Sequence, residues 1–126
     1  MKTIINTDQA PAPIGPYNQA IQCGDLIYTS GQIPIDPATG TKVEGGIREQ
    51  SIQVLDNLKA VLEGAGASLD QVLKTTVFLA DMGDFPEFNS IYADYFGEEN
   101  APARSTIQVA ALPIGALVEI ECVAKT

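Results

Sequence analysis

Two stretches of the chain place apolar residues at intervals of three and four, which is the period of an amphipathic helix. The first runs from Ile47 to Ala65, and Gly66 follows it as a typical C-terminal stop. The second begins at Asp84, where the letters DFPE place a capping residue, an early proline and a glutamate as in a capping box. Its stripe comprises Phe85, Phe88, Ile91, Tyr92, Tyr95 and Phe96. Both stripes predict helices that pack on a sheet.

Strand patterns occupy much of the remaining chain. TIIN, NQAIQC and LIYTSG lie near its start, and the GD between the last two predicts a hairpin turn. A loop rich in Pro and Gly, residues 32–46, leads to the first helix. Between the helices, the β-branched stretch QVLKTTVFLA predicts a central strand. The last part predicts a hairpin, with strands at residues 103–110 and 117–124 joined by the loop ALPIGA.

These elements predict the fold class. Strands and helices both occur, without the regular alternation of a doubly wound parallel sheet. We therefore expect a single α+β domain over residues 1–126, built as two layers, with both helices on one face of a mixed sheet. Several strand residues expected on the other face are apolar, so a partner subunit is the simplest cover for it.

Composition and charge narrow the possible functions. The chain has 126 residues and a hydrophobic content of 45%, enough for an ordinary globular core. A net charge of −9, with seven scattered basic residues, argues against nucleic acid as a partner. No apolar run is long enough to span a bilayer, and the N-terminal stretch lacks the apolar core of a signal peptide. We expect a cytoplasmic protein with no membrane partner.

The side chains available for chemistry narrow the functions further. The chain has no histidine, which removes the commonest general base and metal ligand. A zinc deaminase needs a His/Cys cluster, and a Ser-His-Asp triad needs its histidine, so neither class is expected. Cys23 and Cys122 are too few for a disulfide scaffold and predict free thiols within strands.

Arg104 is an unusual residue in an otherwise small and apolar stretch. Alternation along the predicted hairpin puts Arg104 on the face away from the helices and Ile107 on the face toward them. It also puts Glu119 and Glu121 away from the helices. A symmetric hairpin would place Gln108 opposite Glu119, and Arg104 near Glu121. Two interpretations stay open: Arg104 pairs with Glu121, or it is free to bind a small carboxylate ligand.

Four stretches, taken in order along the chain, are similar to one protein family. APIGPYNQAI, YTSGQIP, FPEFNSIYADYF and PARSTIQVAALPIGALVEIE resemble the RidA (YjgF) family of enamine and imine deaminases. The resemblance implies a chorismate-mutase-like fold with a six-stranded sheet, and a homotrimer with clefts between its subunits. It also implies hydrolysis of 2-imino and 2-enamino acids, such as 2-iminobutanoate and 2-iminopropanoate/2-aminoacrylate, to 2-keto acids and ammonia. No cofactor or metal is implied.

The resemblance also implies a role for particular residues. Arg104 matches the arginine that grips the substrate carboxylate, and Glu119 matches the glutamate that holds the attacking water. Tyr17 matches a tyrosine that lines the cleft and is assigned with them to catalysis. The other substrate-binding positions it implies are Ser30, Gly31, Asn89 and Thr106. Many relatives have cysteine at the position of Thr106, so no thiol chemistry is expected there.

Imine hydrolysis suits a site without histidine, because the imine carbon is already electrophilic and a carboxylate can position the water. Two other functions remain open. The same cleft could bind a small carboxylate without turnover, in a regulatory or chaperone-like trimer. An endoribonuclease activity has also been attributed to some relatives of the RidA family, although the net charge of −9 counts against it.

Overall fold

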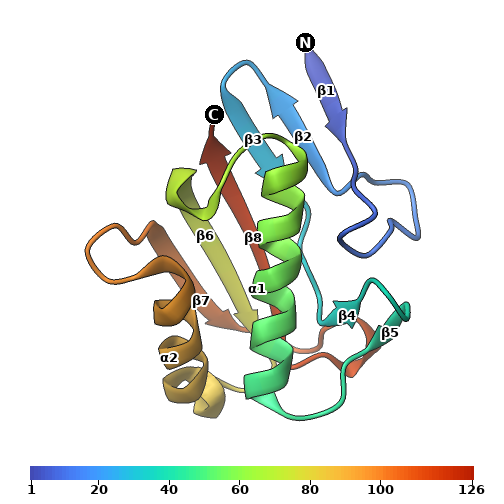
Figure 1. Ribbon diagram of the computed structural model, residues 1–126. Helices are drawn as coiled ribbons and strands as arrows, with labels where there is room; N and C mark the ends of the chain where they lie inside the picture. Colours follow the sequence, from blue (N-terminus) through green and yellow to red (C-terminus); the bar gives the residue numbers. More distant parts are fainter.

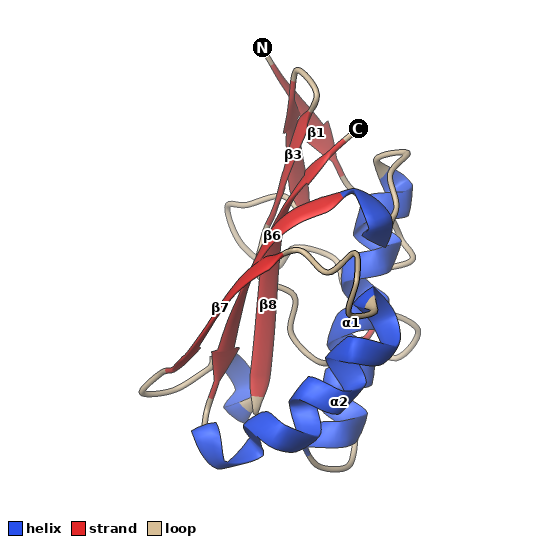
Figure 2. Cartoon of the chain, turned by 90° about the vertical axis from the view of Figure 1, so that its left-hand side faces the viewer, coloured by secondary structure: helices blue, strands red, loops and turns tan.

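The computed structural model describes all 126 residues. Its main feature is a six-stranded sheet in the order β1-β2-β3-β8-β6-β7, with both helices on one face (Figures 1 and 2). The strands of this sheet are β1 (Lys2–Ile5), β2 (Ala20–Cys23), β3 (Leu26–Thr29), β6 (Val72–Leu79), β7 (Ala103–Gln108) and β8 (Val118–Lys125). Only β6 and β7 pair in parallel, so the sheet is mixed. The two-layer α+β prediction is confirmed.

Helix α1 (Ile47–Gly64) forms over nearly the predicted range. The carboxylate of Glu49 accepts a hydrogen bond from the backbone N–H of Gly46 at 2.9 Å, which satisfies a donor at the start of the helix. Its apolar stripe forms the centre of the core, where five side chains have no exposed surface: Val54, Leu55, Leu58, Val61 and Leu62. A short ribbon of β4 (Ile35–Asp36) and β5 (Thr41–Lys42) precedes α1.

Helix α2 (Phe85–Phe96) follows a short 3-10 turn over Met82–Asp84. The predicted capping box is wrong, because Asp84 already has a helical backbone and its side chain makes no capping hydrogen bond. Asp81 takes the capping role one turn earlier, where its carboxylate accepts from the N–H of Gly83 at 2.8 Å. Neither helix is long and apolar enough to cross a membrane.

The predicted hairpin of the last two strands is wrong, because β6 lies between β7 and β8. The chain leaves β6, crosses the sheet through α2 and returns in β7 parallel to β6, as Figure 1 shows. The ALPIGA loop then carries the chain past the end of β6 to its other side, where β8 pairs antiparallel with it. Gln108 and Glu119 are therefore not cross-strand neighbours, and neither are Arg104 and Glu121.

The orientation predicted for β7 is also reversed. In the parallel register Arg104 lies beside Thr75, which is fully buried on the helix side of the sheet. Arg104 therefore faces the helices, and Ile107 faces away from them with 47% of its surface exposed. The prediction turned Ile107 toward the helices because this residue is apolar. Polarity alone does not determine which side of an edge strand faces the core, since such a strand has only one neighbour.

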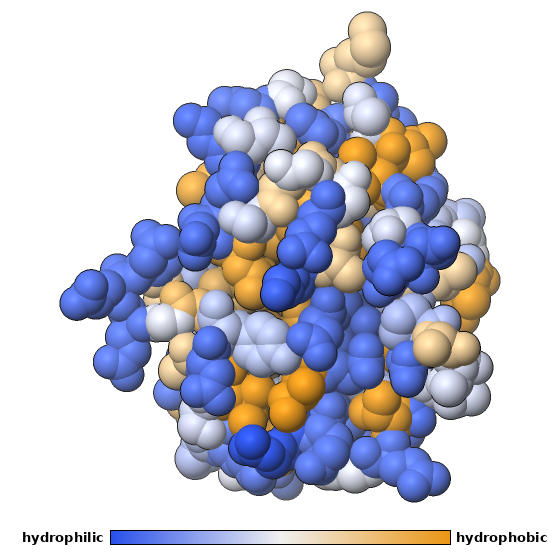
Figure 3. Space-filling view, in the orientation of Figure 1, coloured by the Kyte–Doolittle hydropathy of each residue, from blue (hydrophilic) through white to orange (hydrophobic).

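The sheet face opposite the helices is uncovered in this chain (Figure 2). A row of residues in register crosses four of its strands: Ile4, Ile21, Tyr28 and Val123. Ile4 and Tyr28 are 55% and 48% exposed, respectively. By contrast, the helix-bearing face is mainly hydrophilic, with small separate hydrophobic patches (Figure 3). The apolar side chains on the uncovered face have the character of a surface that another protein covers.

Candidate active site

Arg104 is held against helix α2. Its Nη1 donates a hydrogen bond of 2.8 Å to Oδ1 of Asn89, and its guanidinium lies 4.7 Å from the ring centre of Tyr92 and 5.3 Å from that of Phe85. A cavity of about 330 Å³ opens beside it, between α2 and the turn that precedes β7. The one ion pair of the chain joins Lys125 and Asp25. Arg104 thus has no carboxylate partner, and the alternative of an Arg104–Glu121 pair is wrong.

Glu119 lies in a second cleft, on the uncovered face of the sheet. This cleft has a volume of about 440 Å³, and its lining includes Tyr17, Ser30, Gly31 and Glu119. Four of the predicted site residues thus meet in one cavity, although they come from three separate parts of the chain. Burial raises the pKa of the Glu119 carboxyl above its ordinary value, and the charge of Glu121 on the same face raises it further.

The backbone after β3 approaches Glu119 closely. A side chain at Gly31 would overlap the carboxylate of Glu119, so any larger residue here would displace that carboxylate from its present position. The next residue, Gln32, exchanges two backbone hydrogen bonds with Ile120, at 2.8 and 3.1 Å. These bonds fix the segment against β8. Ser30 is fixed as well, since its hydroxyl donates to the carbonyl of Asn18 at 2.6 Å.

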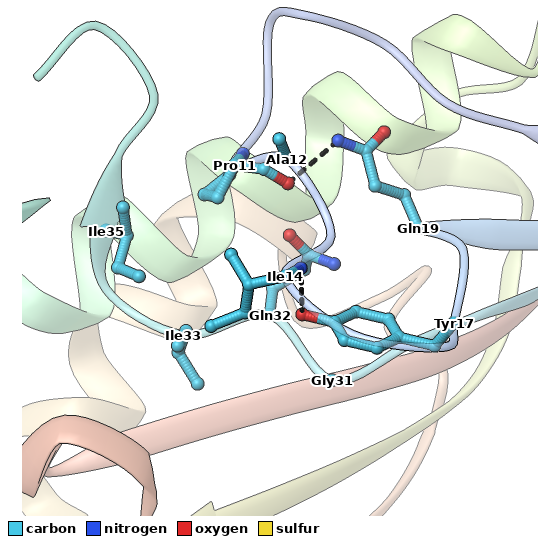
Figure 4. Close-up of a pocket in the computed structure, with 9 residues that line it drawn as sticks. All are labelled: Pro11, Ala12, Ile14, Tyr17, Gln19, Gly31, Gln32, Ile33 and Ile35. Atoms are coloured by element: carbon cyan, nitrogen blue, oxygen red, sulfur yellow. Dashed lines mark hydrogen bonds between the residues drawn. The ribbon is translucent and has the colours of Figure 1, made fainter. Parts of the chain in front are cut away.

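Tyr17 stands at the rim of the cleft, on the long loop between β1 and β2. Its hydroxyl accepts a hydrogen bond of 3.4 Å from the N–H of Ile14 (Figure 4). Tyr17 is 48% exposed and Ile14 is 87% exposed, so both side chains are open to a ligand or a partner. Beneath them the same loop closes over a small side pocket of about 40 Å³, whose walls include Ile33 and Ile35.

Gln19 was not predicted from the sequence, yet it organises this loop. Its side chain is 2% exposed and bonds to four backbone groups. Its Oε1 accepts from the N–H of Thr7, and its Nε2 donates to the carbonyls of Thr7, Ala10 and Pro11 (Figure 4 draws the last). The loop has almost no regular structure of its own, so this one amide replaces the missing backbone pairs. Its sequence signal is only a polar residue next to an apolar strand.

Two further buried amides, both on α1, hold other walls of the cleft. Asn57 donates to the carbonyls of Ile33 and Ile35, at 3.1 and 2.9 Å. Gln50 accepts from the N–H of Leu117 at 2.8 Å, just before the strand that carries Glu119. Both side chains are at most 3% exposed. A glutamine or an asparagine within an apolar helical stripe was the signal that could have identified them.

The structure does not bring all predicted site residues together. Arg104, Asn89 and Thr106 lie on the helix side of the sheet, whereas the cleft of Glu119 opens on the uncovered side. The hydroxyl of Thr106 is buried and has no hydrogen-bond partner in the chain. Arg104 and Glu119 therefore line two separate cavities of one chain. The chain also brings together no group of three acidic, cysteine or histidine side chains that could hold a metal ion.

Comparisons with known proteins identify the family of this arrangement. Residues 7–126 match the family model described as Endoribonuclease L-PSP. The chain is 54% identical to a RutC family protein of Pyrococcus horikoshii, and the match covers 98% of each chain. It is 50% identical to the 2-iminobutanoate/2-iminopropanoate deaminase of Mus musculus, with 98% of this chain and 91% of the mouse protein covered.

Solved structures have the same architecture along the whole chain. The YjgF gene product of E. coli superposes with a TM-score of 0.92 at 46% identity, and E. coli TdcF with bound serine does so with 0.93 at 41%. Each match covers 98% of both chains. The fold is thus that of the small α+β proteins represented by YjgF. With the family match over residues 7–126, the chain belongs to the RidA (YjgF) family.

Proposed function

We propose that this protein hydrolyses 2-imino acids and their 2-enamino tautomers, such as 2-iminobutanoate and 2-aminoacrylate, to 2-keto acids and ammonia. The observation that carries the proposal is the state of Arg104, which is a fixed guanidinium beside a cavity, with no carboxylate partner in its own chain. An arginine in this state is suited to bind a small carboxylate through two parallel hydrogen bonds. The deaminase name of the mouse relative supports the same substrate class.

The active site of this proposal lies between two subunits of a homotrimer. Arg104 and Glu119 face opposite sides of one sheet, so a single chain cannot present both to one small ligand. Arg104 lies on the edge strand β7, so Arg104 of one copy and Glu119 of the next can meet if this edge of one subunit is placed against the uncovered face of its neighbour. The exposed apolar row on that face supports such an assembly.

In the proposed reaction, Arg104 fixes the substrate carboxylate and so orients the imine carbon. Glu119 holds a water and takes its proton as the oxygen bonds to that carbon, and the imine nitrogen gains a proton. The hydroxyl proton of the resulting carbinolamine is then transferred to its amine nitrogen, the C–N bond breaks, and ammonia leaves as the keto group forms. Burial raises the pKa of Glu119 toward the range in which a carboxylate is an effective base. Tyr17 at the rim donates a hydrogen bond to the substrate.

The experiment that tests this function measures keto acid release from 2-aminoacrylate or 2-iminobutanoate, generated freshly in the assay by a pyridoxal-phosphate dehydratase. We expect wild type to accelerate the release above the spontaneous rate. Arg104→Lys keeps the charge but loses the planar fork, so this variant should still be severely impaired. Arg104→Ala should lose about 2–5 kcal/mol of carboxylate binding. The exposed Glu63→Gln, on α1, is the matched control and should behave as wild type. Release at the spontaneous rate by folded wild type would exclude the function.

The same samples separate the two other functions. The Endoribonuclease L-PSP description of the family makes RNA cleavage a specific alternative. If the protein is a ribonuclease, it should cleave single-stranded RNA, and the Arg104→Ala variant should keep this activity. The bound serine of TdcF supports a ligand-binding role for small carboxylates in a relative. For this chain, binding of 2-ketobutanoate without any acceleration of imine hydrolysis would favour a regulatory trimer over an enzyme.

A further inference from the structure

Three residues of α2 surround the guanidinium of Arg104. Phe85, Asn89 and Tyr92 are spaced by four and three residues, so they lie on one face of the helix. Tyr92 and Phe85 present their rings at 4.7 and 5.3 Å from the guanidinium carbon, and Asn89 accepts from Nη1 at 2.8 Å. This one face of α2 therefore supplies both aromatic surfaces and the hydrogen-bond acceptor that Arg104 uses.

The tyrosine of this group is itself fixed. Its hydroxyl lies 2.7 Å from the hydroxyl of Thr75, which is the residue beside Arg104 in the register of β6 and β7. The ring of Tyr92 packs against Phe88 and Phe96, with ring centres 5.6 and 4.6 Å away. Only 4% of Tyr92 is exposed. The ring under Arg104 is thus held by both the helix and the sheet.

These contacts leave most N–H donors of Arg104 free to bind a carboxylate. A guanidinium has five N–H donors in a rigid plane, and the bond to Asn89 occupies only one of the two Nη nitrogens. Stacking on aromatic faces constrains the plane without using the donors at its edge. The cavity of about 330 Å³ lies beside this edge. An arginine that is immobile before the ligand arrives loses less conformational freedom when it binds.

We propose that Phe85, Asn89 and Tyr92, with Thr75 behind Tyr92, are positioning residues that fix the guanidinium plane of Arg104 before a carboxylate binds. We call these four residues the arginine seat. The proposal rests on the proposed function for the identity of the ligand, but the immobility of the free side chain does not depend on it. It also gives the carbonyl oxygen of Asn89 a task other than contact with the substrate, since this oxygen is already bonded to Arg104.

The mobility of Arg104 can be measured directly, because the chain has only two arginines, Arg48 and Arg104. NMR relaxation of the two Nε–Hε groups in the ligand-free protein compares the seated arginine with Arg48, which is exposed. We expect a backbone-like order parameter for Arg104, about 0.8, and one below about 0.6 for Arg48. The variant Phe85→Leu should lower the order parameter of Arg104 markedly. Equal mobility of the two arginines in wild type overturns the proposal.

Binding and turnover provide the second measurement. In Phe85→Leu we expect the Kd for 2-ketobutanoate and the KM for the imine to rise about tenfold, with kcat changed less than twofold. Tyr92→Phe and Thr75→Val keep the ring or the shape and should raise both constants about two- to fourfold. Tyr95→Phe is the matched control, because it deletes another tyrosine hydroxyl of α2, bonded to Asp56 on α1 at 2.7 Å.

A purely structural role for the four residues predicts a different result. Each seat variant would then lower the melting temperature as Tyr95→Phe does, and leave Kd, KM and the order parameter of Arg104 at their wild-type values. That result overturns the arginine seat. Failure of the proposed function is distinct from this, since it appears as no keto acid release by wild type, whatever the mobility of Arg104.

Discussion

At the scale of single residues, the proposed general base Glu119 destabilises the fold in its charged form. Its carboxylate is half-buried in the cleft, no basic side chain pairs with it, and Glu121 lies two residues away on the same face. Burial of the charge and the neighbouring carboxylate both raise its pKa from the ordinary value of 4.5. A group whose pKa is higher in the folded state than in the unfolded state destabilises the fold in its charged form.

Glu119→Gln is therefore expected to stabilise the protein while it abolishes turnover. Stability from a protonated Glu119 is complete below its ordinary pKa of 4.5 and is lost as the pH rises through the raised value. At neutral pH wild type bears this cost and the glutamine variant does not. Solvent screening of the half-exposed carboxylate keeps the cost small, so the variant should be more stable by less than about 1 kcal/mol. Urea unfolding at matched protein concentration, at neutral pH and in acid, measures the difference. A benefit that grows on acidification would contradict this account.

Glu121→Gln removes the second cause of the raised pKa of Glu119, which is the charge of Glu121. Removing its charge lowers the pKa of Glu119, so Glu119, the proposed general base, stays ionised to lower pH. The acid limb of the pH profile of kcat/KM should move to lower pH, with the plateau rate nearly unchanged. Glu63→Gln, exposed on α1, is the control. An acid limb that stays in place in Glu121→Gln would mean that Glu119 is not the group that titrates.

At the scale of elements, the irregular segments around the cleft depend on buried side-chain amides. Gln19, Gln50 and Asn57 each bond to backbone groups that have no strand or helix partner. An amide is both a donor and an acceptor, so it can replace the ladder of a missing strand. The cost of removing one is large, since the backbone groups stay buried without partners.

Gln19→Leu tests this dependence in the loop of Tyr17. The substitution leaves four backbone groups without their side-chain partner, and we expect a loss of about 2–4 kcal/mol in the free energy of unfolding. Gln9→Leu is the matched control, because Gln9 is exposed in the same loop, and it should change stability by less than about 0.5 kcal/mol. Equal losses of unfolding free energy in the two variants, measured by chemical unfolding, would show that the loop does not depend on the side-chain amide of Gln19.

The elements also show what sequence can and cannot determine. Helix α1 and the strands up to β3 were predicted correctly because their signals are local, in the period of apolar residues and the GD turn. The partner of β7 is not a local property. The ALPIGA loop could close a hairpin or pass the end of another strand, and only packing of α2 on the sheet decides that β7 joins β6.

The same limit applies to the candidate site. Motif resemblance predicted the residues that meet around Gly31 and Glu119, although it gave no geometry for them. Alternation put Arg104 on the wrong face, since the strand's phase followed Ile107, which is exposed. The arginine is stable on the helix side because Phe85 and Tyr92 stack on its guanidinium. Such a contact joins distant segments, so no window of sequence contains it.

At the scale of the whole molecule, Arg104 and Glu119 of one chain face opposite sides of its sheet. For the proposed function, symmetry offers a solution in which each subunit supplies one of the two residues and its neighbour the other, as in a ring built from a head-to-tail interface. In a homotrimer, three such clefts would form, each with Arg104 from one subunit and Glu119 from the next. A stable monomer in a mass measurement in solution would remove this arrangement.

Mixed trimers provide the sharpest test of a shared site. Arg104→Ala and Glu119→Gln should each be inactive as pure trimers, since every cleft lacks one of the two groups. Unfolding the two variants together and refolding them at equal amounts gives random trimers. A cleft is intact when the Glu119→Gln chain supplies its arginine and the Arg104→Ala chain supplies its glutamate, so about a quarter of the clefts should be active.

The expected result is therefore recovery of about a quarter of the wild-type rate from two inactive proteins. Mixing Arg104→Ala with Arg104→Lys under the same conditions is the control, because no combination of these chains restores the planar arginine, and the rate should stay near that of the separate variants. If Arg104 and Glu119 acted within one chain, every subunit of the mixture would carry a defect and no rate would return. Recovery thus measures the sharing itself, independently of how each substitution changes the stability of its own subunit.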